Sequence, residues 1–171
     1  MLPDTFVTFT PDGQDPSWRP DWDPMIRLEE PTSFQDLPQS VFIWYYFQAR
    51  VTFRVGGVDL SQSMDGVPVS ILDFVLMLQA AKAMLLRDGS AEIGLSDRGD
   101  QWWFTQHDEL VSVRTRGALD KGWIEGSCPT EEFKQLVDIC LADALRLMFW
   151  EQPALRQNTY LQTLARRPPG A

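Results

Sequence analysis

Alternation of hydrophobic and polar residues marks the first regular element of the chain, over residues 41–55. Every odd position in this range is apolar, and the even positions from Gln48 onward are polar. A repeat of two residues is typical of a β-strand with one buried face. We therefore predict one long strand over 41–55. Its first half is apolar on both faces, because Phe42, Trp44 and Tyr46 occupy even positions, and a second layer must cover them.

Apolar spacing of three and four residues predicts two long amphipathic helices. Ser70 is the expected N-cap of the first helix and Gly89 its C-terminal stop. Thr130 is the expected N-cap of the second helix, which Pro153 ends. The buried stripe of the second helix is predicted to be Phe133, Leu136, Val137, Cys140, Leu141, Ala144, Leu145 and Met148.

Between the two helices, residues 91–128 read as a series of short strands separated by turns rich in Gly and Asp. Turn residues at intervals of eight to twelve are typical of antiparallel pairing. The predicted fold class is therefore α+β, with an antiparallel meander of about five to six strands packed against two main amphipathic helices. The core face of the meander is predicted to carry Trp102, Phe104, Val111 and Val113.

We expect one folded unit with three parts, because a chain of 171 residues is of ordinary size for one domain. Residues 1–40 form a leader packed on the domain, residues 41–153 form the α+β core, and residues 154–171 form a short helix and a tail.

The leader differs from the rest of the chain in charge and proline content. Residues 1–40 contain eight acidic residues against two arginines, a net charge of −6, and seven of the 12 prolines. Trp18 and Trp22 lie among them, in the segment 15–24 (DPSWRPDWDP). An acidic, proline-stiffened segment with large aromatic residues suits docking, either onto its own domain or onto a basic partner. Both roles stay open at this point.

The overall charge and hydropathy limit the kinds of partner. The net charge is −9 and the pI about 4.5, so nucleic acid and anionic membranes would be repelled. No apolar run approaches the ~20 residues that span a bilayer. The first residues lack the features of a secretory signal, and two cysteines that are too far apart to pair suit a reducing compartment. We expect a cytoplasmic protein, as a monomer or a homodimer.

No set of reactive residues stands out in the sequence. His107 is the one histidine and is expected in a solvated hairpin turn with Asp108 and Glu109, because a zinc site needs further convergent ligands. Cys140 lies in a buried helical stripe, and Cys128 lies at a helix start, where a helix dipole can activate a thiol. The paired carboxylates are explained by turns and helix starts. We predict no catalytic residues, no metal and no cofactor.

Four segments of the chain resemble a known type of protein. They are 53–60 (FRVGGVDL) leading into 67–74 (VPVSILDF), then 100–104 (DQWWF) and 130–137 (TEEFKQLV). Their order is similar to that in small actinobacterial immunity proteins found beside polymorphic toxins, and the resemblance covers roughly residues 50–150. It implies a cytoplasmic, non-catalytic protein that binds and blocks one toxin domain. No functional residue carries over, since such families vary their binding surface.

We therefore hypothesise a binding module that neutralises a basic partner, such as a toxin domain, by acidic and aromatic surface complementarity. Two alternatives remain: a small carboxylate-dependent hydrolase, and a homo-oligomeric scaffold protein. The predicted partner-binding residues are Trp18, Asp21, Trp22, Asp23, Glu29 and Glu30.

Overall fold

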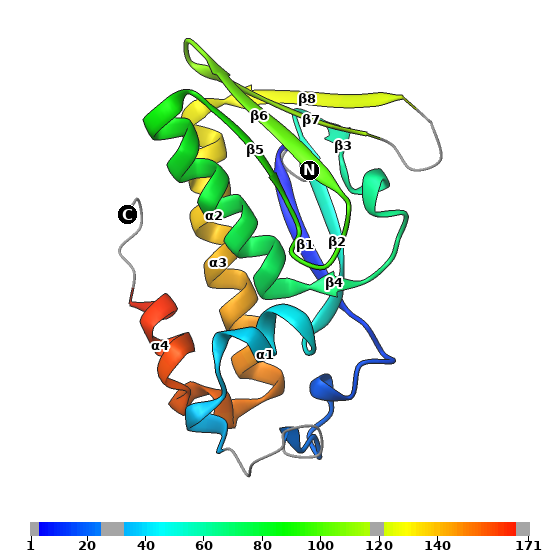
Figure 1. The fold of residues 1–171 in the computed structure, drawn as a ribbon, viewed down its shortest axis with the longest axis vertical. Coiled ribbons are helices and arrows are strands. Elements are labelled where there is room, and N and C mark those ends of the chain that lie inside the picture. The colour runs from blue at the N-terminus through cyan, green and yellow to red at the C-terminus, as the bar shows by residue number, and fades with distance from the viewer. Residues whose placement is uncertain (1–3, 25–32, 117–121, 167–171) are drawn as a thin grey trace.

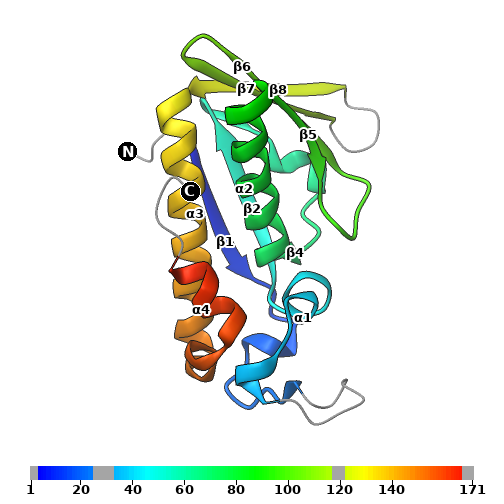
Figure 2. The same cartoon turned by 60° about the vertical axis from the view of Figure 1, so that its left-hand side comes forward.

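Two long helices, α2 and α3, lie side by side and are flanked by two antiparallel sheets (Figure 1, Figure 2). The computed structural model describes residues 4–24, 33–116 and 122–166. The predicted α+β class is confirmed. The strands are β1 (Phe6–Pro11), β2 (Gln48–Val55), β3 (Val58–Asp59), β4 (Val69–Ser70), β5 (Ser90–Gly94), β6 (Gln101–His107), β7 (Leu110–Arg116) and β8 (Trp123–Pro129). The α-helices are α1 (Gln39–Trp44), α2 (Ile71–Asp88), α3 (Thr130–Glu151) and α4 (Thr159–Ala165), and the 3₁₀ turns include η1 (Pro16–Trp18), η3 (Phe34–Asp36), η4 (Ser61–Met64) and η5 (Pro153–Gln157).

The first sheet is built around β2. Strand β1 pairs with β2 along its length, from Phe6 opposite Arg54 to Pro11 opposite Ala49, and the short strands β3 and β4 also pair with β2. The predicted alternation holds over β2, whose odd positions are buried while Arg50 and Arg54 are exposed. The second strand that β2 needs for a stable sheet therefore comes from the acidic leader.

The prediction of a single strand over 41–55 is wrong for its first half. Helix α1 occupies most of that stretch and buries Val41 and Phe42. The chain then turns at Phe47, which has a positive φ of 58°, before β2 begins. A short apolar run has the same pattern in a buried helix as in a buried strand, so alternation alone could not distinguish the two.

The second sheet is a four-stranded meander in the order β5-β6-β7-β8. It forms as the turn pattern of residues 91–128 predicts, but it is separate from the sheet around β2, so the strands are divided between two sheets. The predicted core face is confirmed, because its four apolar residues are all buried. They are Trp102, Phe104, Val111 and Val113.

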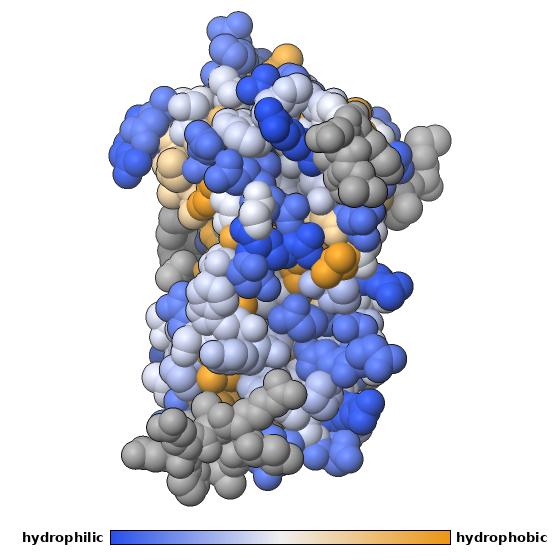
Figure 3. Space-filling view, turned by 45° about the vertical axis from the view of Figure 1, so that its right-hand side comes forward, coloured by the Kyte–Doolittle hydropathy of each residue, from blue (hydrophilic) through white to orange (hydrophobic). Residues whose placement is uncertain are grey.

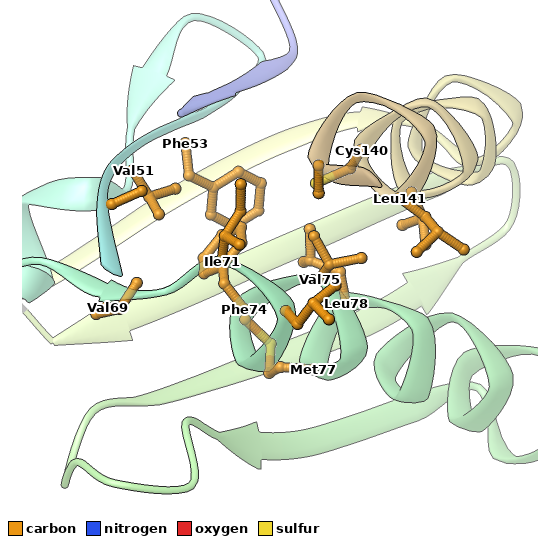
Figure 4. Packing of buried hydrophobic residues seen from close by; sticks show 14 of the residues in the cluster. Val51, Phe53, Val69, Ile71, Phe74, Val75, Met77, Leu78, Cys140 and Leu141 are labelled. Atoms are coloured by element: carbon orange, nitrogen blue, oxygen red, sulfur yellow. The ribbon is translucent and has the colours of Figure 1, made fainter. Parts of the chain in front are cut away.

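Helix α2 lies between the two sheets and is buried on most of its surface. Figure 4 shows side chains of α2 packed against Val51 and Phe53 of β2 and against Cys140 of α3. The ring of Phe74 lies 5.6 Å from that of Phe53 and 6.3 Å from that of Trp102 in β6, so one residue of α2 joins both sheets. The predicted ends are confirmed, with Ser70 as N-cap and Gly89 in the left-handed region as C-cap.

Helix α3 packs along α2 and covers the same core. All eight residues of its predicted stripe are buried. Thr130 is its first residue and not its cap, a correction to the prediction: Pro129 holds the cap position, and the Thr130 hydroxyl has no hydrogen-bond partner among the described residues. Lys82 of α2 donates to Asp138 of α3 at 2.7 Å. No helix within the described ranges is both long and apolar enough to cross a membrane.

Polar side chains tie the leader to the corner between α1 and β2. The Asp15 carboxylate is buried and accepts two hydrogen bonds, one from the backbone N–H of Gln48 at 2.6 Å and one from the Ser17 hydroxyl at 2.8 Å. The Ser17 hydroxyl in turn accepts from the backbone N–H of Phe47 at 2.8 Å. These bonds satisfy buried backbone donors at the turn that precedes β2, so the corner depends on the leader.

The C-terminal segment holds the leader from the other side. The side-chain amide of Gln152 donates to the backbone carbonyl of Ser17 at 3.0 Å. Asn158 is fully buried, caps α4, and donates to the carbonyls of Phe34 and Leu37 at 2.8 and 3.0 Å. One cluster of buried hydrophobic residues runs from Trp18 to Leu164, so the leader, the core and the C-terminal helix share a single interior.

Candidate partner-binding surface

The six residues predicted to bind a partner have different positions in the structure. Trp18 and Trp22 are each only 8% exposed, whereas Asp21 and Asp23 are exposed. The remaining two, Glu29 and Glu30, lie outside the described residues. The segment around Asp21 is thus divided between carboxylates that face solvent and indoles that face inward.

Both tryptophans of the leader pack on the domain itself. The Trp18 indole N–H donates to the Gln48 carbonyl at 2.7 Å, and its ring lies 4.9 Å from that of Phe47. The Trp22 ring lies 4.8 Å from that of Tyr46 and 5.3 Å from that of Phe47. Burial leaves little of either ring for a partner to contact, so the aromatic part of a binding surface has to come from other residues.

Two such residues lie at the end of α1. The side chains of Trp44 and Tyr45 are 45% and 61% exposed, and they are the only neighbours in sequence among the large hydrophobic residues exposed in the described ranges. Helix α1 turns Val41 and Phe42 inward, which leaves the residues at its C-terminal end facing solvent. The sequence signal was the unexplained aromatic run of 41–47, which alternation assigned to a strand.

A chain of ring contacts joins these exposed aromatics to the acidic leader. The Tyr45 ring lies 6.5 Å from that of Tyr46, and the Tyr46 ring lies 4.8 Å from that of Trp22. Asp21 and Asp23 flank Trp22 in sequence and are both exposed, so they come from the segment that these ring contacts join to α1. We call Asp21, Asp23, Trp44 and Tyr45 the acidic–aromatic surface. Figure 1 places α1 and the part of the leader that follows β1 at the end of the molecule opposite the β6–β7 hairpin.

Exposed aromatic residues also occur elsewhere in the described ranges: Trp150 of α3 is 77% exposed and lines a hollow together with Val7, Phe9 and Leu147. The side shown in Figure 3 is mostly hydrophilic, and its hydrophobic residues appear in small separate areas. Stable interfaces depend on a few large aromatic residues surrounded by polar groups, rather than on polar area alone. The acidic–aromatic surface combines both kinds of group.

The groups considered for catalysis do not converge in the described part of the chain. His107 lies exposed at the end of β6, beside the hairpin turn where it was expected. Cys128 is buried, and burial, reinforced by the nearby Glu132, raises the pKa of its thiol to about 11. Burial also raises the pKa of the Cys140 thiol well above its ordinary value. Both thiols are unpaired and would be protonated at neutral pH.

Carboxylates give no metal site within the described ranges, where no group of three or more His, Cys, Asp or Glu residues is placed to hold an ion. The most buried acid on a helix is Asp73 of α2. Burial raises the pKa of its carboxyl, which accepts hydrogen bonds from the backbone N–H and the hydroxyl of Ser96 at 2.7 and 2.6 Å. Those bonds fix the loop after β5 to the start of α2, which is a structural role that the sequence did not indicate.

Comparisons with known proteins give no match from which a function could be inferred. No family model, curated protein or solved structure matches this chain. The resemblance to immunity proteins therefore stays a prediction.

Proposed function

We propose that this protein is a non-catalytic binding module of the immunity class, which recognises a basic protein such as a toxin domain through its acidic–aromatic surface. The observation that carries the proposal is the exposed pair Trp44 and Tyr45, which ring contacts through Tyr46 and Trp22 join to the leader segment with the exposed residues Asp21 and Asp23. Exposed aromatic residues are enriched among those that dominate interface energies. Carboxylates at the rim add electrostatic attraction for a basic partner.

Two further features of the molecule suit this role. The net charge of −9 attracts a basic partner over distance and speeds encounter at low salt. The backbone of the leader is held by Asp15, Gln152 and Asn158, so the surface is ordered before a partner arrives. Pre-ordering lowers the entropic cost of association.

The test first screens the proteins encoded by adjacent genes for binding to this chain, and a basic protein that binds serves as the partner. Association and dissociation rates are measured at two salt concentrations for the wild type and for two variants. Asp21→Asn/Asp23→Asn should slow association, more strongly at low salt, because it removes long-range attraction. Tyr45→Ala should speed dissociation by about tenfold or more, since it removes a central aromatic contact.

A matched control removes the same charge at the far end of the molecule. Asp108→Asn/Glu109→Gln alters two exposed acids in the β6–β7 turn, and asparagine tolerates the positive φ of 52° at position 108. Equal slowing by both charge variants would show that only net charge matters and would contradict the proposed surface. The proposal would also be contradicted if light scattering showed that the wild type is a dimer and that Tyr45→Ala is a monomer, because the surface would then join two copies of this chain.

Deleting residues 1–40 does not test the surface, because the deletion also removes β1, Trp18 and Asp15 from the folded core. The point variants above leave these contacts in place. A thermal unfolding scan of each variant confirms that any change in rate arises in the folded protein.

A further inference from the structure

A hollow of about 650 Å³ lies on the solvent-facing side of the second sheet, and none of its lining residues belongs to the acidic–aromatic surface. Its floor is formed by β6, β7 and β8, and its rim by η4 and the loop between β5 and β6. Arg98 of that loop donates to the Met64 carbonyl at the end of η4, which holds the two parts of the rim together. The volume lies within the range of roughly 300–1,000 Å³ that small-molecule sites occupy.

Two arginines and two tryptophans form one stacked cluster in this hollow. The guanidinium carbon of Arg114 lies 4.3 Å from the centre of the Trp123 ring, and that of Arg116 lies 5.0 Å from it. The Trp103 ring meets the same indole edge to face at 5.0 Å. Strand pairing explains the grouping, because Arg114 is opposite Trp103 on one side and Arg116 is opposite Trp123 on the other. We call these four residues the arginine–tryptophan pocket.

Acidic residues lie near the pocket, with Glu92 opposite Trp103 in the pairing of β5 with β6, but none of the described ones forms an ion pair with its arginines. Glu125 is directly opposite Arg114 in the pairing of β7 with β8, yet the guanidinium of Arg114 lies over Trp123. No ion pair or hydrogen bond to either guanidinium occurs among the described residues. Asp100, the acid that lines the hollow, is already bonded to Arg98. Two cations without an ion-pair partner among the described residues thus share one hollow in a chain whose net charge is −9.

The chemistry of the cluster defines the ligand that it suits. Guanidinium groups bind phosphate oxygens in a bidentate manner, and stacking on an indole holds them in place without using their N–H donors. Two adjacent cations match the charge of a phosphate monoester, which is about −1.5 to −2 at neutral pH. The neighbouring indoles offer flat apolar surface to a planar ring. Nucleic acid chains are disfavoured because the whole protein repels them.

We propose that the arginine–tryptophan pocket binds a small organic phosphate that carries a planar aromatic ring, a ligand of the nucleoside monophosphate class. Arg114 and Arg116 contact the phosphate, and Trp103 and Trp123 contact the ring. This site is separate from the acidic–aromatic surface, so partner recognition and ligand binding can be measured independently.

Isothermal titration of the full chain tests the proposal, with adenosine monophosphate, adenosine and inorganic phosphate as the three probes. Adenosine monophosphate should bind at least about tenfold more tightly than either of its parts, because only the whole molecule engages both halves of the pocket. It should also raise the melting temperature, by an amount that grows with the logarithm of its concentration above Kd, as a ligand of the native state does. Arg116→Gln should weaken binding by about tenfold or more, since it removes a charged hydrogen-bond donor.

Arg50→Gln is the matched control, because Arg50 is an exposed arginine on the other sheet. It should leave the affinity unchanged. Equal weakening by both variants would overturn the proposal, and so would the absence of both heat and a melting shift with adenosine monophosphate at millimolar concentration. Equal binding of inorganic phosphate and adenosine monophosphate would show an anion site without ring recognition. Tighter binding of a glutamate-rich peptide would assign the pocket to an acidic protein segment, which also contradicts the proposal.

Discussion

The close approach of the two sheets at Gly56 gives the sharpest test of the fold. Gly56 and Gly57 form the turn between β2 and β3, with φ values of +55° and +80°. A Cβ atom at position 56 would lie 2.1 Å from the carbonyl oxygen of Ser127 in β8, whereas a Cβ at position 57 would meet nothing within 4 Å. The two neighbouring glycines therefore share a left-handed backbone conformation, but only position 57 has room for a Cβ atom.

Replacing each glycine by alanine separates these two effects. Both variants bear the cost of a left-handed alanine, about 1–2 kcal/mol. Gly56→Ala must also move β8 by about 1 Å to restore a normal contact, which adds roughly 1–3 kcal/mol. We expect Gly57→Ala to lose about 1–2 kcal/mol and Gly56→Ala about 2–5 kcal/mol in denaturant unfolding. Equal losses for the two variants would refute the packing of the β2–β3 turn against β8.

Two further predictions concern buried charges and thiols. The Lys82 side chain is 6% exposed and is paired with Asp138. Asp138→Ala leaves the buried ammonium without its partner, so it should lower the free energy of unfolding in urea by about 1–3 kcal/mol more than Lys82→Met does. An equal loss for the two variants would contradict the pairing. Because burial raises the pKa of Cys128 from 9.0 to about 11, the neutral thiol stabilises the fold fully below pH 9, and this contribution is lost as pH rises through 11. Stability measured between pH 9 and 11 should therefore fall further for the wild type than for Cys128→Ala, and parallel curves would show that the thiol does not titrate as its burial requires.

Long periodic segments were predictable because their own residues define the buried face. The stripe of α3, the caps of α2 at Ser70 and Gly89, and the core positions of the meander follow from spacing and turn residues alone. Each depends on neighbours within a few residues, so local sequence carries the information. The α1 region was misassigned for the same reason, since seven apolar residues carry no period that separates helix from strand.

The place of the leader was not predictable, because it depends on contacts between distant residues. Asp15 reaches Gln48, and Asn158 reaches Phe34 and Leu37, and neither bond has a local signature. The composition of the leader left open whether it packs on its own domain or docks onto a partner. It could not show that Trp18 is buried while Asp21 is exposed, since both residues lie in the same proline-rich segment.

The candidate surface was only half predictable for the same physical reason. The carboxylates were visible as an excess of charge in the leader. Trp44 and Tyr45 join them only because the chain turns at Phe47 and brings the end of α1 beside Trp22. The arginine–tryptophan pocket likewise requires the register of β6, β7 and β8, which spacing along the chain does not specify.

Hydrogen exchange on the complex with a basic protein found to bind in that screen tests the central claim most directly. If recognition uses the acidic–aromatic surface, the partner should slow exchange in residues 19–24 and 39–46 and leave the turn at 107–110 unchanged. Slowed exchange at 107–110 with no change around α1 would contradict the account.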